Sequence, residues 1–297
     1  MEALYTDDQI FIPIISDYGF KATFGNEANT LFLRRALQAL IKSEVPIKEV
    51  KFDKNTFEGI TQDGRSGIFD LACTDENDNH FIVEMQYGDA PYFVQRMKFY
   101  ALHKFNAMVK RGKFDYGTLT KIFCVAILAS DILPYYQFHT IANLRNEQGE
   151  LFDDQMTFIT VELDKFTLQE IDCQTDLQKL IYTMKTIHTH TFTNPIQFPK
   201  FWDEDWLKVA IDELDSRKMT PDAKASLEIL IARNAESVKA ESRKIKEAED
   251  RKEKAVKIET VKNGLSMGLT IEQCAKLSNV SEDFVLSVQR QVAGNCP

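Results

Sequence analysis

Two acidic residues stand where a β-hairpin would bring them together. Asp70 ends the segment GIFD, and Glu84 lies inside the apolar segment FIVEMQ. Alternate side chains of a strand share a face, so Glu84 and Gln86 point to the same side. An ionised carboxylate among residues that favour burial is costly unless a positive group meets it, which favours a cation at this pair. Taken alone, the pair is equally well explained as two edge-strand carboxylates in solvent.

A hard divalent cation would satisfy this pair. Mg²⁺ binds carboxylate oxygens and water, and it lets a substrate phosphate complete its coordination shell. Such an ion lowers the pKa of a bound water and neutralises charge that develops on the phosphate. The pair therefore indicates phosphodiester hydrolysis. Gln86 would orient the attacking water or a phosphate oxygen, but its amide supplies neither the charge nor the protons of a lysine.

The element that positions the pair is a hairpin predicted over residues 68–73 and 81–86. The intervening run, DENDN at 75–79, consists of residues that tolerate tight turns. A calcium loop is the alternative for this run. His80 stands where that loop requires glycine and Gln86 where it requires a bidentate glutamate, so the sequence favours a plain turn.

The surrounding pattern predicts a mixed α/β layer architecture. A helix is expected over residues 30–41 with Thr30 as its N-cap, and another over residues 92–109 that follows Pro91. The expected extended segments are 50–60, 65–73, 121–129 and 156–163, and helices are expected from Asp176, over 202–214 and over 221–231.

The C-terminal part has a different composition. Residues 235–262 are dominated by charge and form only an imperfect heptad pattern, which predicts an exposed helix or linker. After it, Thr270 and Gln273 have the spacing of a capping box, and Ser281 is a second cap candidate. Two short helices should follow, and a packing or oligomerisation unit is favoured over a DNA-reading one.

Charge and cysteine content narrow the class of protein. The formal net charge of −9 argues against bulk electrostatic coating of nucleic acid, so a DNA site must be a local basic patch. Residues 96–113 contain six lysines and arginines and no acid, although a solvated helix face explains such a run equally well. The five cysteines form no CxxC pair, which fits a reducing, cytosolic location. The longest apolar run, 122–129, is too short to span a membrane.

Three segments together resemble a known family. They are DYGFKATFG at 17–25, IFDLACTDENDNHFIVEMQ at 68–86, and Gln95-Arg96 with Tyr100. Asp70, an interval of 13 residues and then Glu84-Met85-Gln86 resemble the PD-(D/E)xK nuclease motif with glutamine in place of lysine. The combination is similar to the Rpn family of recombination-promoting nucleases and transposases. That resemblance implies a restriction-endonuclease-like mixed sheet flanked by helices, with an α-helical C-terminal extension.

The resemblance also implies roles for individual residues. Asp70 and Glu84 would be metal ligands together with the backbone carbonyl of Met85, and Gln86 would occupy the lysine position as a catalytic residue. The predicted phosphate-binding residues are Gln95, Arg96, Lys21 and Lys104, and the weaker site candidates are Asp17, Glu27 and Tyr100. The predicted parts are a nuclease-like core (1–170), a helical part packed on it (171–234), a charged helix or linker (235–262) and a small helical unit (263–297).

These observations favour a DNA endonuclease that uses Mg²⁺, with Mn²⁺ able to substitute. DNA is the expected partner, a homo-oligomer is left open, and neither a membrane nor an organic cofactor is expected. The runner-up is a DNA-binding or interaction protein that keeps the fold without catalysis, which Gln86 and the acidic charge motivate. A scaffold that oligomerises through the charged helix is a third class. The segment 17–25 is either a functional loop or a turn fixed by Gly19 and Gly25, and His188 and His190 are assigned no function.

Overall fold

A computed structural model of the protein describes residues 8–57, 67–68, 70–86, 92–109, 112, 114–192 and 197–293. The chain divides into two compact units, Met1–Leu230 and Ile231–Pro297. Among the described residues no helix is both long enough and apolar enough to cross a membrane.

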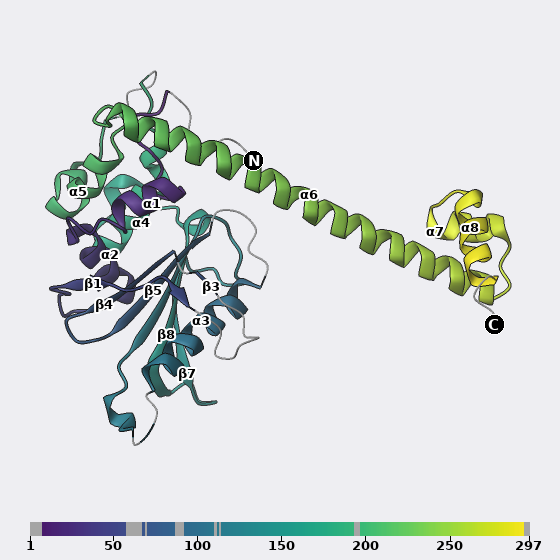
Figure 1. The fold of residues 1–297 in the computed structure, drawn as a ribbon, viewed down its shortest axis with the longest axis horizontal. Coiled ribbons are helices and arrows are strands. Elements are labelled where there is room, and N and C mark those ends of the chain that lie inside the picture. The colour runs from purple at the N-terminus through teal and green to yellow at the C-terminus, as the bar shows by residue number, and fades with distance from the viewer. Residues whose placement is uncertain are drawn as a thin grey trace. The chain divides into compact units, whose positions relative to one another are not determined.

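The first unit is built on a six-stranded mixed sheet with the strand order β1-β4-β5-β6-β8-β7 (Figure 1). β5, β6 and β8 are parallel neighbours, and the other pairings are antiparallel. The strands are β1 (Val50–Phe52), β4 (Leu71–Asp75), β5 (His80–Gln86), β6 (Ile122–Leu128), β7 (His139–Arg145) and β8 (Leu151–Glu162), and a separate ladder joins β2 (Thr56–Phe57) to β3 (Gly67–Ile68). The expected mixed α/β architecture is confirmed.

The predicted hairpin is present as β4 and β5, whose residues pair from Leu71 with Val83 to Thr74 with His80. The turn between them is held by Asp75. Its Oδ1 accepts the backbone N–H groups of Asn77 and Asn79, each at 2.9 Å, and its Oδ2 accepts the Asn79 amide at 3.0 Å. Both oxygens of the Asp75 carboxylate therefore accept hydrogen bonds within the turn. This is the plain turn that the sequence favoured over a calcium loop.

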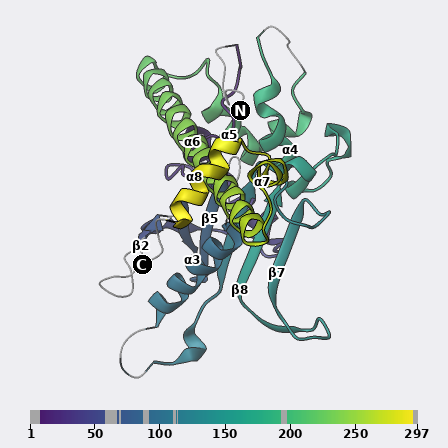
Figure 2. The same cartoon turned by 90° about the vertical axis from the view of Figure 1, so that its right-hand side faces the viewer.

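One face of the sheet is covered by α3 (Phe93–Met108) (Figures 1 and 2). Its buried residues Phe93, Met97 and Ala101 pack against a cluster that includes Ile82 of β5 and Ala126 of β6. Because side chains alternate along a strand, Glu84 points to the same face as Ile82. The helix that covers this core therefore also borders Glu84.

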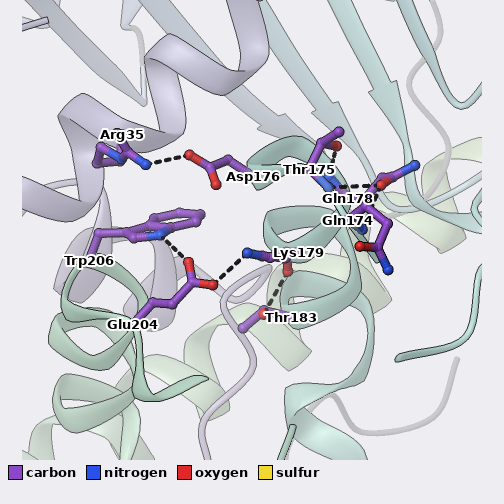
Figure 3. A network of polar contacts seen from close by, with 9 residues as sticks. All are labelled: Arg35, Gln174, Thr175, Asp176, Gln178, Lys179, Thr183, Glu204 and Trp206. Atoms are coloured by element: carbon purple, nitrogen blue, oxygen red, sulfur yellow. Dashed lines mark hydrogen bonds and ion pairs between the residues drawn. The ribbon is translucent and has the colours of Figure 1, made fainter. Parts of the chain in front are cut away.

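The opposite face is covered by helices (Figures 1 and 2): α1 (Asp17–Thr23), α2 (Leu31–Ile41), α4 (Asp176–Thr186) and α5 (Asp205–Leu214). Polar contacts tie α2, α4 and the start of α5 together (Figure 3). Arg35 Nη2 lies 2.5 Å from Asp176 Oδ2, and Glu204 accepts both Lys179 Nζ at 2.5 Å and the Trp206 indole N–H at 3.0 Å. Short 3-10 turns complete the unit at Tyr116–Thr118, Leu163–Lys165, Glu170–Asp172, Ile187–Thr189 and Lys200–Asp203.

Residues 17–23 form a helix rather than only a turn. Ser16 caps α1 by accepting the Gly19 N–H at 2.9 Å, and Lys21 pairs with Asp17 one turn apart. A Cβ at Gly19 would lie 2.0 Å from the Pro13 carbonyl oxygen, so only glycine permits this close approach of the two backbones.

The sheet differs from the sequence prediction at its β7 edge. β7 was not predicted, and β8 begins at Leu151 rather than near residue 156. β7 is exposed along much of its length and its pairing with β8 shifts register, so it lacks a regular alternating pattern. Residues 58–66 and 69 of the predicted strand region lie outside the described residues, and Gly67–Ile68 between them form the ladder strand β3.

The second unit comprises the later part of α6 (Pro221–Ser266), α7 (Ile271–Ser278) and α8 (Glu282–Ala293). The charged segment 235–262 is helical throughout. Thr270 and Gln273 form the predicted capping box, and Ser281 accepts the Phe284 N–H at 3.3 Å. A small apolar cluster holds the three helices together through Val261, Cys274, Ala275, Val285 and Val288.

Candidate functional site

The register of the hairpin aligns the two predicted metal ligands. Leu71 pairs with Val83, so extending the antiparallel register by one residue sets Asp70 opposite Glu84. Opposite side chains of such a pair share a face, with Cβ atoms roughly 5 Å apart. The Met85 N–H donates to Asp70 Oδ2 at 2.7 Å and holds that carboxylate at the start of β4.

Glu84 is a buried acid with incomplete compensation. Its Oε2 lies 3.5 Å from Nη2 of Arg96 on α3, whereas its Oε1 is buried and has no hydrogen-bond partner among the described residues. Burial, followed by repulsion from the Asp70 carboxylate, raises the pKa of Glu84 to about 8, and the Arg96 guanidinium and a hydrogen bond from the Asp70 backbone only partly oppose this. Contacts within the protein therefore do not fully offset the cost of ionising Glu84.

Asp70 is also poorly compensated. Burial of its carboxylate is the main cause that raises its pKa, although the residue as a whole retains exposed surface. The Met85 N–H opposes the rise, and so do the charges of Arg96 and Lys21, while the charge of Asp17 adds to it. Residues of α1 and α3 thus both act on the field at Asp70.

The other predicted site residues on the hairpin and α3 differ in position. Gln86 ends β5 two residues beyond Glu84 and is half-buried, on the same face by strand alternation. Gln95 is exposed on α3 next to Arg96. Tyr100 is half-buried and packs against the apolar cluster under α3.

Two predicted residues lie apart from the carboxylate pair. Lys104 forms an ion pair with Asp53 Oδ2 at 2.8 Å. Glu27 is exposed between α1 and α2, and no described contact joins it to Asp70 or Glu84. Three members of the basic run, Lys110, Arg111 and Lys113, lie outside the described residues.

Asp53 is the centre of a second polar cluster, which the sequence did not reveal. Besides Lys104, its Oδ2 accepts the Thr74 hydroxyl at 2.9 Å and lies 3.6 Å from His80 Nδ1. The His80 ring, and then Lys104 and Thr74, hold the pKa of Asp53 below its ordinary value despite burial. The one sequence signal for it is that Thr74 and His80 become neighbours in the hairpin register.

The donor set at Asp70 and Glu84 fits a divalent cation. No group of three or more His, Cys, Asp or Glu side chains suitable for a metal occurs in the described part of the chain. Mg²⁺ does not require one, since it is commonly held by one or two carboxylates while water and phosphate supply the remaining ligands. The unpartnered Oε1 of Glu84 and the raised pKa of both acids are what a cation between them would relieve.

Comparison with protein families decides the assignment. The model of the PD-(D/E)XK nuclease family transposase matches residues 14–260. The chain belongs to this family. No curated protein and no solved structure matches it. The match confirms the resemblance seen in the three sequence segments and the restriction-endonuclease-like fold of the mixed sheet. PD-(D/E)XK nucleases generally use divalent metal ions.

The extent of the family match separates two parts of this nuclease-family chain. It includes the hairpin, α3 and most of α6, and it ends before α7 and α8. The small apolar cluster of the second unit therefore lies largely outside the family region.

Proposed function

We propose that this PD-(D/E)XK family member is a metal-dependent DNA endonuclease whose cation is held by Asp70 and Glu84. The observation that carries the proposal is the pair of adjacent, under-compensated carboxylates on one face of the hairpin. Mg²⁺ is the proposed ion, and Mn²⁺ should substitute for it. The Met85 backbone carbonyl remains the proposed third protein ligand.

The bound ion would supply acidification of a water molecule and neutralisation of charge on the phosphate. The chain's own residues would do the rest. Arg96 keeps 43% of its side chain exposed and has a planar fork suited to a phosphate oxygen, so it would hold the scissile phosphate beside Glu84. Gln86 would orient the attacking water through its amide. Lys21, exposed on α1, would contact a neighbouring phosphate.

Plasmid cleavage tests the proposal. Asp70→Asn and Glu84→Gln proteins should lose Mg²⁺-dependent and Mn²⁺-dependent nicking. Asp78→Asn is the matched control, because it removes the same charge from the exposed turn at the other end of the hairpin, where asparagine tolerates the positive φ of 58°. Unchanged nicking by both site variants would overturn the mechanism.

A second candidate is a DNA-binding protein without catalysis. Gln86 favours it, because an amide in the lysine position supplies no proton or positive charge. Salt-sensitive DNA binding without cleavage in either metal would select this candidate. For either function we propose a reducing, cytosolic location. Whether the chain forms a homo-oligomer stays open, and analytical sedimentation would measure it.

A further inference from the structure

Two exposed aromatic rings, one on α3 and one immediately before it, flank in sequence the residue that contacts Glu84. Tyr92 is 77% exposed and Phe99 is 40% exposed, and Arg96 lies between them in sequence. Gln95, Arg96 and Phe99 lie on one side of α3, because residues three and four apart share a helix face, and Tyr92 precedes the helix as its N-cap residue with a left-handed φ of 60°. Arg96 is therefore both the Glu84 partner and part of this aromatic stripe, which we define as Tyr92, Gln95, Arg96 and Phe99.

The charge of this helix suits a nucleic-acid backbone. Residues 92–109 contain Arg96, Lys98 and Lys104 and no acid, in a chain whose net charge is −9. Arg96 is the cation of the stripe, because Lys98 is exposed about 200° round the helix from it and Lys104 is engaged with Asp53. Positive charge interleaved with exposed rings is the combination by which proteins bind single strands, with phosphates on the cations and bases stacked on the rings.

Exposed rings would favour an unpaired DNA strand over a duplex. In a duplex the base faces are stacked on one another, so exposed phenyl and phenol rings gain no stacking partner there. An unpaired strand of a few nucleotides could therefore stack on both rings while its backbone reaches Arg96.

We propose that the aromatic stripe of α3 binds an unpaired DNA strand and delivers it to the Asp70–Glu84 site. This proposal rests on the proposed nuclease function and specifies its substrate class as DNA with unpaired nucleotides. Tyr92 and Phe99 are binding residues in it, and Arg96 connects the bound strand to the carboxylates.

Fluorescence with all metal chelated tests binding separately from cleavage. Trp202 and Trp206 are both buried, so a Phe99→Trp protein carries one new exposed indole that reports stacking. Oligothymidylate should quench it saturably, and a duplex of equal length should bind more weakly and quench little. Tyr92→Ala and Phe99→Ala should each weaken oligothymidylate binding by about 5- to 150-fold.

Controls make each outcome decisive. Val94→Ala, an exposed apolar position outside the stripe, should bind oligothymidylate as the parent does. Phe99→Leu keeps apolar bulk without the ring and should lose affinity as Phe99→Ala does, which excludes a folding defect. Equal losses for single strand and duplex, no quenching, or a change of molar mass in Phe99→Ala would overturn the proposal, the last because the face would then cover a second chain. Glu84→Gln should still bind oligothymidylate while failing to cut, so the two proposals fail separately.

Discussion

The acids near the two ends of the β4–β5 hairpin are compensated to different extents. Near the turn, Asp53 is met by Lys104, Thr74 and His80, and its pKa is lowered. At the other end, the partly exposed Arg96 and one backbone N–H for each acid only partly offset the burial of Asp70 and Glu84, and both pKa values are raised. Both sites border α3. The difference separates an acid that contacts within the protein compensate from two acids that we propose bind a cation.

The largest expected effect is on the rate of cleavage, and it follows from removing an acid at the Asp70–Glu84 end of the hairpin. Replacing Asp70 by asparagine should lower the rate of metal-dependent cleavage by roughly 10²- to 10³-fold, the usual effect of removing one preorganised electrostatic group. Single-turnover cleavage measures it. In the folded Asp53→Asn protein the rate should stay within a few-fold of the parent, and an equal loss in both would erase the functional distinction between the two ends.

Mg²⁺ should stabilise the fold by binding at the Asp70–Glu84 end of the hairpin and not at Asp53. Mg²⁺ at about 100 times its Kd should add about 2.7 kcal/mol to the free energy of unfolding. Thermal unfolding with and without Mg²⁺ measures this, and Glu84→Gln should abolish the shift while Asp53→Asn retains it. A shift that survives in Glu84→Gln would place the ion elsewhere.

Removing the internally neutralised acid should cost stability instead. Asp53→Ala leaves Lys104 and the Thr74 hydroxyl without their shared acceptor, so the free energy of unfolding should fall by about 1–3 kcal/mol. Urea unfolding measures the loss. Asp78→Asn in the exposed turn should change stability by less than about 0.5 kcal/mol.

The smallest effect concerns pH. Because the folded-state pKa of Asp53 lies below its ordinary value near 4, this group stabilises the fold above that value. The contribution is lost as pH falls from about 4 through the lowered pKa. Asp53→Asn should therefore have a flatter stability curve below pH 4 than the parent, and parallel curves would show that Asp53 is not preferentially stabilised in its ionised form.

The hairpin and its acid pair were predictable because they follow from local rules. Strand alternation and a turn-forming run determine which residues share a face, and the observed register, extended by one residue, sets Asp70 opposite Glu84. The helix at 17–23 was harder to predict, because it is short and contains Gly19, whose role depends on contact with Pro13.

Partners that are distant in sequence explain the rest. Lys104 was predicted to contact phosphate from its place in a basic run, and that role stays a prediction. Its ion pair with Asp53 joins α3 to the end of β1 across 51 positions, a separation over which no periodic pattern operates. β7 was not predicted for a different reason. Its residues are largely exposed and its pairing with β8 shifts register, so its sequence shows no regular alternation of apolar and polar side chains.

The hydrogen bond from the Met85 N–H to Asp70 forms only when β4 and β5 are aligned as they are here, so the position of the acid pair depends on correct pairing of the hairpin. A slip of one residue between β4 and β5 would turn one carboxylate to the other side of the sheet. A misaligned or partly folded chain would then lack the paired acids altogether. The Asp75 turn, which holds the two strands in this alignment, would thus determine whether the proposed metal-binding pair forms at all.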